Sequence, residues 1–534
     1  MSISTLRGIV SRVMPTRKPH ATPVTATRVD YAKIAATAEE KAAAFQHPKG
    51  KNTARERLNM LLDADSFVEI GQFAGGNPAT GFLGAAVVTG FGEIAGRQVA
   101  VYAQDFSVRG GTLGRAEGQK ILALMDKALA MKIPIISMLD SGGARIQEGV
   151  IALSQYGRIF KKTCEASGLI PQISMILGPS AGGAVYAPAL TDFIIMTKEN
   201  SHMFVTGPEV VKAVTGENVS MNELGGGELH NFQSGVAHYL ADDEVDAIDY
   251  VRSLLSYLPS NCDELPPSYT YTPSVEDEKA AAEVQALVPE DSRKPYDVVE
   301  VIEHLVDYGE FLEISQGFAT SIVIGFACIN GSAVGIVADQ PNHNAGTLDV
   351  DASEKAARFV RCCDAYGIPI VTLVDVPGYR PGTEQEQAGI IRRGAKLIYA
   401  YANATTPMVT IILRKAYGGA YIVMGSKSIG ADFAFAWPDA EIAVMGAEGA
   451  VNILHRREIK AAGPNEKDMN QARQRLADEY QANVINPALS VEEGELDGII
   501  DPVLTRQTIA ESLEILRTKD RSHPGPKRHS NGPL

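Results

Sequence analysis

Cysteine is scarce in this sequence, and the cysteines present are not spaced for metal binding. None of the five forms a Cys-x-x-Cys pair or has histidines at a ligand spacing, so we assign no metal ligands. An odd number of cysteines, without a disulfide framework or an apolar signal region, favours a reducing compartment, which we expect to be the cytoplasm. The thiols then act as small core side chains. They are Cys164, Cys262, Cys328, Cys362 and Cys363.

Three further features are missing. No apolar run reaches the roughly 18 to 20 residues that a membrane span needs, so we expect a soluble protein with no membrane partner. The chain has 49 basic and 64 acidic residues, a net charge of −15, and therefore lacks the basic excess of a nucleic-acid-binding protein. No Gly-x-x-x-x-Gly-Lys-Ser/Thr loop occurs, so ATP chemistry of the P-loop kind is not supported.

The first 29 residues contain basic side chains and no acid. We expect a disordered basic tail of a bacterial protein. The alternative is a mitochondrial transit peptide, which is also basic and poor in acids and would place the protein in the mitochondrial matrix. The sequence leaves both readings open. The basic residues are Arg7, Arg12, Arg17, Lys18 and Arg28, and the first acid is Asp30.

The chain contains an internal duplication. A Gly-Thr-Leu motif, an Ile-Pro-Ile strand start, an aspartate and a Gly-Gly pair recur in the same order, each at a spacing of 235 or 236 residues. Such agreement in residue type, order and spacing predicts two homologous domains. The paired landmarks begin at Gly111 and Gly346, Ile133 and Ile368, Asp140 and Asp375, and Gly182 and Gly418.

The predicted domains are residues 30–262 and 297–516. Between them, residues 263–296 are rich in proline and acids, which indicates a linker with a short helix at Val275 to Leu287. Residues 517–534 form a polar C-terminal tail.

Each half alternates strands, glycine-rich turns and helices. In the first half a predicted hairpin from Val87 to Tyr102 precedes a helix from Ala116 to Met131 and a buried strand from Ile133 to Leu139. A glycine-rich segment, Asp140 to Arg145, follows this strand. This order is typical of an α/β layer that binds ligands at the carboxyl ends of its strands.

The Gly-Gly pairs stand at the most informative positions. Apolar, β-branched runs at Pro171–Leu177 and Pro407–Leu413 each lead through glycines into a segment that reads as helix. A strand that enters a helix in this way presents bare backbone N–H groups at a positive helix end. Such a turn can stabilise developing negative charge.

Two other local matches suggest different chemistry. Gly178–Gly182 fits the Gly-x-Ser-x-Gly nucleophile elbow, in which Ser180 would need a histidine to accept its proton. The second half has Ala416 in the corresponding segment, so the duplication preserves the amide donors and not the hydroxyl. Ala130–Ile133 resembles a biotinylated tetrapeptide, but Lys132 lies between a helix and a strand, and a solvated helix-end cation explains it. The candidate bases are His202, His230 and His238.

Six motifs together resemble the carboxyltransferase (β) subunits of biotin-dependent acyl-CoA carboxylases, in particular propionyl-CoA carboxylase β and its actinobacterial acetyl/propionyl relatives. The resemblance extends from Tyr31 to Leu534. The motifs are Asp140–Gly149, Met203–Pro208, Glu354–Phe359, Asp375–Gly378, Arg414–Tyr421 and Ala443–Ala447.

The resemblance implies two tandem crotonase-like domains, each a β-β-α superhelix of the α/β class. It implies a homohexamer in which the N-terminal domain of one subunit faces the C-terminal domain of another. The N-terminal domain would bind acyl-CoA, and the C-terminal domain would bind carboxybiotin on a separate carrier. ATP would be used only by the partner biotin carboxylase (α) subunit.

The transferred carboxyl group then defines two sites for negative charge. We assign the amides of Gly182 and Gly183 to the thioester oxygen and those of Gly418 and Gly419 to the biotin ureido oxygen, and each such donor is worth roughly 3 kcal/mol. The biotin ureido nitrogen can remove the α-proton, so no side-chain base is required. Close strand-to-helix packing is the alternative explanation of these glycines. Further predicted contacts are Gly142, Gly143, Ala144 and Ala181 for the substrate, and Ala420 and Tyr421 for the biotin.

Acyl-chain selectivity depends, by resemblance, on Ile422, where an apolar residue indicates mixed acetyl-CoA and propionyl-CoA activity. Arg109 and Arg380 depart from the resemblance and would either contact a CoA phosphate or polar acyl group, or be surface arginines. Two other functions stay open at this point. They are a CoA-thioester decarboxylase subunit of the same fold and a non-enzymatic CoA-binding scaffold.

Overall fold

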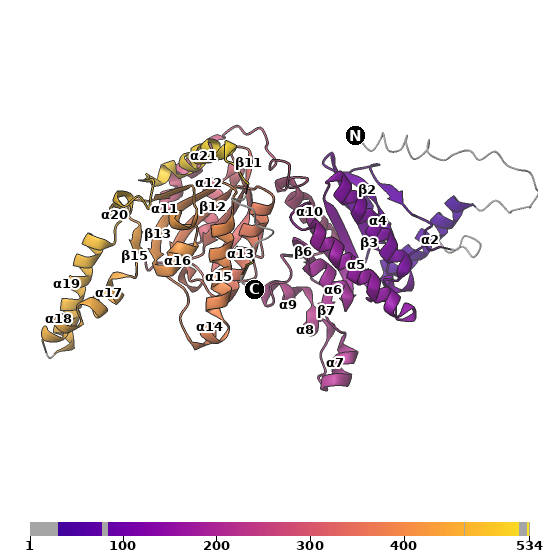
Figure 1. Ribbon diagram of the computed structural model, residues 1–534, viewed down its shortest axis with the longest axis horizontal. Coiled ribbons are helices and arrows are strands. Elements are labelled where there is room, and N and C mark those ends of the chain that lie inside the picture. The colour runs from indigo at the N-terminus through magenta and orange to yellow at the C-terminus, as the bar shows by residue number, and fades with distance from the viewer. Residues whose placement is uncertain (1–29, 77–83, 464, 523–530, 533–534) are drawn as a thin grey trace, which may run out of the picture. The chain divides into compact units, whose positions relative to one another are not determined.

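A computed structural model describes residues 30–76, 84–463, 465–522 and 531–532. The predicted basic tail, residues 1–29, lies outside this part of the chain. The structure divides into two compact units with the boundary between Glu264 and Leu265. The two are drawn in Figure 1, the first in indigo to magenta and the second in rose to yellow.

The first unit is built on one mixed sheet of eight strands within the described residues, ordered β1-β2-β3-β4-β5-β6-β8, with β7 paired to β5. Strands β1 to β3 pair antiparallel, and the pairs from β3 onward are parallel. The strands are β1 (Val68–Ile70), β2 (Val87–Ile94), β3 (Arg97–Gln104), β4 (Ile135–Ser141), β5 (Gln172–Ala181), β6 (Phe193–Thr197), β7 (His202–Phe204) and β8 (Tyr239–Ala241).

Helices cover both faces of this sheet (Figure 1). Helices α4 (Arg115–Met131), α5 (Val150–Ala166) and α6 (Gly183–Ala189) enclose the main apolar core with the sheet. Helices α3 (Ala54–Leu61) and α10 (Glu244–Tyr257) pack together on β2, β3 and β5. The remaining helices are α2 (Tyr31–Gln46), α7 (Pro208–Thr215), α8 (Met221–Gly225) and α9 (Gly227–Phe232).

The second unit repeats this topology. Its sheet of eight described strands has the order β9-β10-β11-β12-β13-β14-β16, with β15 paired to β13, so every strand corresponds to one in the first unit. This correspondence confirms the internal duplication. The strands are β9 (Phe311–Ile314), β10 (Ile322–Ile329), β11 (Ser332–Asp339), β12 (Ile370–Val376), β13 (Met408–Tyr417), β14 (Phe433–Ala436), β15 (Glu441–Ala443) and β16 (Gly498–Ile499).

The predicted hairpin is present as β2 and β3, β10 and β11 form its counterpart in the second unit, and each turns through two residues with positive φ. In the first unit Ala95 and Gly96 have φ of 50° and 75°, and in the second Asn330 and Gly331 have φ of 49° and 77°. These are the values of a type I′ turn, whose twist matches that of the paired strands.

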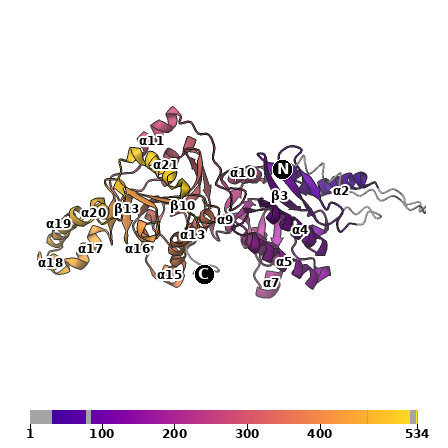
Figure 2. The ribbon, with the colours of Figure 1, turned by 45° about the horizontal axis from the view of Figure 1, so that its top comes forward.

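In the second unit, α13 (Val350–Ala365) and α15 (Ile390–Asn403) lie side by side. Helices α17 (Ala447–Leu454), α18 (Arg456–Ala461) and α19 (Glu466–Val484) form an arm that projects from the rest of this unit (Figures 1 and 2). The other helices are α11 (Val275–Leu287), α12 (Val298–Leu305), α14 (Thr383–Gln387), α16 (Gly418–Val423), α20 (Pro487–Glu492) and α21 (Thr505–Ile515).

Residues 263–296, which the sequence presents as a linker, belong almost entirely to the second unit. The expected helix is present as α11, and Val284 is fully buried in a core shared with α12, the sheet and α21. The backbone after α11 closes over Arg414, whose guanidinium donates to the carbonyls of Pro289, Asp291 and Lys294. The proline-rich composition correctly indicated irregular backbone after α11, but this backbone packs against Arg414 of the second unit.

Within the described ranges, no helix is both long and apolar enough to cross a membrane. The same residues contain no group of three His, Cys, Asp or Glu side chains arranged to hold a metal ion.

Candidate active site

The glycine-rich turns of the first unit lie at the carboxyl ends of the neighbouring parallel strands β4 and β5. Up to Leu139 and Ile176 the two strands pair regularly, but the next pair is Ser141 with Ser180. Strand β5 therefore has two extra residues at this point, which is a β-bulge, and bulges re-aim the backbone beside functional sites. The bulge carries the Gly182-Gly183 turn beyond the end of β4.

The first Gly-Gly turn needs glycine at both positions, for different reasons. Gly182 has φ 61° and ψ −124°, a conformation that other residues rarely adopt. Its amide already donates to the carbonyl of Phe204, with an N···O distance of 3.2 Å. Gly183 begins α6, so its amide has no intrahelical acceptor. A Cβ on Gly183 would lie 2.8 Å from the ring of Tyr156.

The turn after β4 faces the Gly-Gly turn, since the two strands are neighbours. The Gly142 amide donates to Gly110 O at 2.9 Å, and the Gly143 amide donates to Ser141 Oγ at 3.1 Å. Ala144 forms a parallel bridge to Leu113 in which the residues on either side of Ala144 make the hydrogen bonds. Backbone groups alternate in direction along extended chain, so the Ala144 amide points away from this bridge. Within these two turns, the Ala144 amide points away from its bridge and the Gly183 amide has no intrahelical acceptor.

The second unit has the same bulge and glycine turn, but the surroundings of its second glycine differ. Strand β13 has two extra residues relative to β12 between the pairs Val374–Ile412 and Val376–Ala416, and Gly418 has φ 61°. Gly419 is exposed, its φ is ordinary, and a Cβ built on it would meet no atom within 4 Å. The space beside Gly419 is thus open to a ligand.

The next residues of α16 divide between core and surface. Ala420 and Tyr421 are buried, and the hydroxyl of Tyr421 has no hydrogen-bond partner among the described residues. Burial raises the pKa of Tyr421 to about 12, so the phenol is neutral at physiological pH. Ile422, the predicted selectivity residue, is exposed.

A fully buried aspartate stands at each bulge and is neutralised differently in the two units. Asp140 accepts from Lys51 and from Arg57 Nη1, the latter at 3.1 Å. Burial lowers the pKa of Lys51, and Asp140 opposes that change. Gly178 must be glycine because its Cβ would lie 1.9 Å from an Asp140 carboxylate oxygen.

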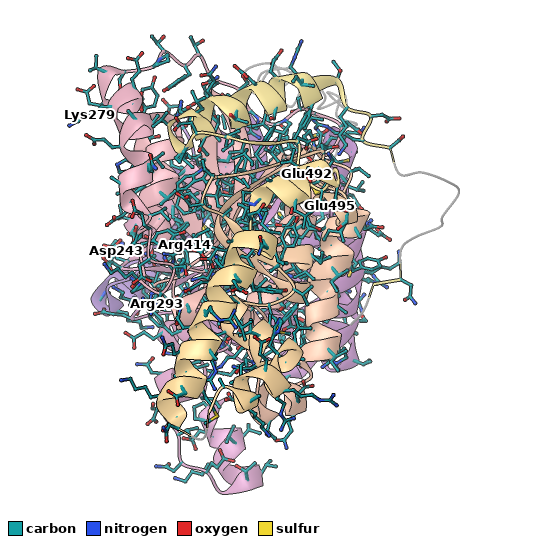
Figure 3. The ribbon with its side chains drawn as sticks, turned by 90° about the vertical axis from the view of Figure 1, so that its left-hand side faces the viewer. Asp243, Lys279, Arg293, Arg414, Glu492 and Glu495 are labelled. Atoms are coloured by element: carbon teal, nitrogen blue, oxygen red, sulfur yellow. The ribbon has the colours of Figure 1, made fainter. Side chains whose placement is uncertain are left out.

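In the second unit Arg414 occupies the position that corresponds to Gly178. Its Nε donates to Asp375 Oδ2 at 2.9 Å, and the Lys415 amide donates to Asp375 Oδ1 at 3.1 Å. Arg414, labelled in Figure 3, is buried among the side chains of this unit. The cation therefore comes from β13 itself, whereas in the first unit it comes from α3 and the segment before it.

The nucleophile-elbow hypothesis finds no support in the structure. Ser180 is fully buried, and its Oγ has no hydrogen-bond partner among the described residues. The three candidate histidines are engaged elsewhere. His202 pairs with Asn222, His230 with Met203 O and Ser234, and His238 accepts from the Ile194 amide.

The other singled-out cations lie in the following surroundings. Lys132 ends α4 with φ 54° and forms an exposed ion pair with Asp263, which agrees with a helix-end cation. Arg380 lies 3.9 Å from both Asp349 and Glu384. Arg109 adopts φ 53° at the start of a short 3-10 helix, Arg109–Gly111.

Comparison with known proteins decides the family. The family described as "Carboxyl transferase domain" matches residues 45–531. The chain belongs to the carboxyl transferase family. This confirms the predicted carboxyltransferase, and with the two duplicated sheets it confirms two tandem crotonase-like domains.

Individual relatives of this carboxyltransferase are similar over almost their whole length. The propionyl-CoA carboxylase beta chain of Saccharopolyspora erythraea is 54% identical, covering 93% of each chain. The biotin-dependent acetyl-/propionyl-coenzyme A carboxylase beta5 subunit of Mycobacterium tuberculosis is 52% identical, covering 91% of each. The hexameric transcarboxylase 12S, solved with methylmalonyl-coenzyme A and methylmalonic acid bound, superposes with a TM-score of 0.90 at 46% identity, over 97% of this chain and 100% of that one.

Sequence reasoning found both glycine turns and both aspartates, because the duplication marks them. It missed Tyr156 and Ser141, which contact the first turn and the neighbouring one. The only available signal for Tyr156 was its place among the apolar residues of a helix, which is equally typical of a core side chain.

Proposed function

We propose that this carboxyltransferase moves CO2 to the α-carbon of a short-chain acyl-CoA, with the thioester bound by the first unit and carboxybiotin by the second. The observation that carries the proposal is the pair of equivalent glycine turns, one at the carboxyl edge of each duplicated sheet. The reaction creates negative charge on two oxygens, and two donor sets at equivalent positions match that requirement.

In the first unit the amides of Ala144 and Gly183 would bind the thioester oxygen as the enolate forms. Gly182 provides the left-handed turn, while its own amide holds the Phe204 carbonyl. Gly142 and Gly143 use their amides to fix the neighbouring turn, and Ala181 ends β5 beside them. These residues orient the thioester and leave its α-carbon to react.

In the second unit the residues present fit a ureido ring. Gly419 leaves open space where a side chain would project, and the first amides of α16, those of Gly418, Gly419 and Ala420, lack intrahelical acceptors. Tyr421 would border the ring. Carboxybiotin supplies the CO2 and, after the transfer, a nitrogen that can hold the α-proton.

The partners follow from the same relatives. A separate biotin carboxylase and biotin carrier (α) subunit would load the biotin and consume ATP, which the naming of the biotin-dependent relative as a beta subunit supports. Homohexamer assembly is proposed from the solved transcarboxylase 12S. Propionyl-CoA and acetyl-CoA are the proposed substrates, supported by the names of the relatives and by the apolar Ile422.

The reverse reaction tests the proposal without a partner subunit. Purified protein is incubated with methylmalonyl-CoA or malonyl-CoA and free biocytin, and the formation of propionyl-CoA or acetyl-CoA is followed. Biocytin-dependent product is expected. Product formed without biocytin would indicate direct decarboxylation or thioester hydrolysis, and no product from either thioester would contradict the proposed substrates.

A further inference from the structure

A buried tyrosine lies directly beneath the first Gly-Gly turn. Tyr156, in the middle of α5, is 4% exposed. Three of its ring carbons would lie 2.8 to 3.1 Å from a Cβ on Gly183. The aromatic face therefore limits how far the start of α6 can sink toward α5.

The other end of the side chain reaches the neighbouring turn. The Tyr156 hydroxyl interacts with the side chain of Ser141. Burial raises the pKa of this phenol, and the Ser141 hydroxyl opposes the rise. Ser141 Oγ itself donates to Gly111 O at 2.7 Å and accepts from the Gly143 amide at 3.1 Å. One side chain thus borders both turns that carry the proposed donors.

The second unit has no such support at its turn. No atom of the described residues lies within 4 Å of a Cβ built on Gly419. The two units share one fold, so this fold is compatible both with a packed turn, as at Gly183, and with an open turn, as at Gly419. The aromatic support is therefore a property of the half proposed to bind the thioester.

Ordinary core filling does not explain the position well. Tyr401 is an equally buried tyrosine in the second unit, 1% exposed, and its hydroxyl forms a 2.9 Å hydrogen bond with Thr372. The hydroxyl of Tyr156 points instead to Ser141, between two turns of the site.

We propose that Tyr156 is a positioning residue that sets the separation of the Gly183 and Ala144 amides, and hence the geometry of the thioester oxyanion site. The proposal rests on the proposed function of the first unit. Its ring supports Gly183, and its hydroxyl end keeps Ser141, and through it Gly143, at a fixed distance. A displacement of about 1 Å in such a site can lower the rate about 100-fold.

The test compares Tyr156→Leu and Tyr156→Phe with the matched control Tyr401→Leu in the biocytin-dependent reverse reaction. Tyr156→Leu should lower kcat/KM for methylmalonyl-CoA about 10- to 100-fold, while KM for biocytin changes less than about 2-fold. Tyr156→Phe keeps the ring under Gly183 but loses the hydroxyl beside Ser141, so its kcat/KM should lie between those of wild type and Tyr156→Leu. Tyr401→Leu should lower the unfolding temperature without favouring either substrate. An unchanged kcat/KM for methylmalonyl-CoA in Tyr156→Leu, a rise in its KM for biocytin by about 10-fold or more, or the same losses in Tyr401→Leu would overturn the proposal.

A second variant covers the case in which Tyr156→Leu folds poorly. In Tyr156→Leu/Gly183→Ala the new methyl group occupies space that the ring has left, so the double variant should recover part of the thioester kcat/KM relative to Gly183→Ala alone. Strictly additive losses would contradict the proposed contact. Wild-type protein without biocytin-dependent transfer would instead refute the proposed function, so the two failures are distinguishable.

Discussion

The glycines of the two turns are required for different reasons. Gly183 cannot accept a Cβ because the buried Tyr156 ring occupies that space, whereas Gly419 has ordinary φ and open space. Glycine within a helix costs about 0.5 to 1 kcal/mol relative to alanine. The fold alone therefore favours alanine at 419, and a ligand that approaches the backbone explains the glycine.

This difference predicts opposite effects on stability. Gly183→Ala should lower the thermal unfolding midpoint, because overpacking a core typically costs about 1 to 3 kcal/mol. Gly419→Ala should leave the midpoint unchanged or raise it slightly. Differential scanning calorimetry of both variants measures this directly, and a lower midpoint for Gly419→Ala would show that the fold itself requires that glycine.

Ile422 provides a prediction about substrate choice. It follows Tyr421 in α16 and is exposed, so its side chain is available to a bound acyl group. Ile422→Asp should shift the ratio of kcat/KM values toward propionyl-CoA and away from acetyl-CoA, as measured with both thioesters in the reconstituted carboxylase. An unchanged ratio would remove this position from the account of selectivity.

At the scale of elements, the last residues of β11 and β3 differ in type, but the side chain of each accepts a hydrogen bond from the amide of the buried aspartate on the neighbouring strand. Asp339 ends β11, is fully buried, and accepts from the Asp375 amide at 3.2 Å. The corresponding residue of β3 is Gln104, whose side-chain oxygen accepts from the Asp140 amide at the same distance. Burial raises the pKa of Asp339 well above its usual value, and the hydrogen bond from the Asp375 amide opposes the rise.

The raised pKa predicts how stability depends on pH. In the unfolded chain Asp339 ionises near pH 4, whereas in the folded chain it stays protonated. The free energy of unfolding therefore falls as the pH rises from about 4 toward the folded pKa of Asp339. Asp339→Asn preserves the acceptor and removes the loss. The free energy of urea unfolding should therefore fall less between pH 4 and pH 7 in this variant than in wild type.

Glu492→Gln, at an exposed acid labelled in Figure 3, is the matched control for Asp339→Asn and should follow the wild-type profile. A profile for Asp339→Asn that coincides with wild type would show that the folded protein tolerates the charge at residue 339.

The elements themselves were largely predictable. Helix α4 begins one residue before the predicted start at Ala116, because its apolar residues recur at helical spacing. Helix α11 has the predicted bounds, because a capping box at Ser274 and Asp277 marks its start. The packing of the segment after α11 over Arg414 was not predictable. It depends on a charge that the second half carries in β13 and the first half carries in α3, and pairing between distant segments leaves no local signal.

At the scale of the whole molecule, the duplication accounts for most of what the sequence revealed. Comparing the two halves reveals the glycines and aspartates that they share, and the residues at equivalent positions can be compared. The engagement of the Gly182 amide by Phe204 was not visible, since it depends on how β7 pairs with the end of β5. Because the Gly182 amide is engaged, we propose Gly183 and Ala144 as the thioester donors in place of Gly182 and Gly183.

The central claim is that the two units bind different substrates through equivalent turns. The most direct test is the steady-state kinetics of Gly419→Ala in the reverse reaction, with methylmalonyl-CoA and biocytin varied separately. The account predicts that kcat/KM for biocytin falls by about 100-fold, because the added methyl occupies the open space, while KM for methylmalonyl-CoA stays within about 2-fold of wild type. A rise in KM for the thioester with unchanged use of biocytin would contradict it.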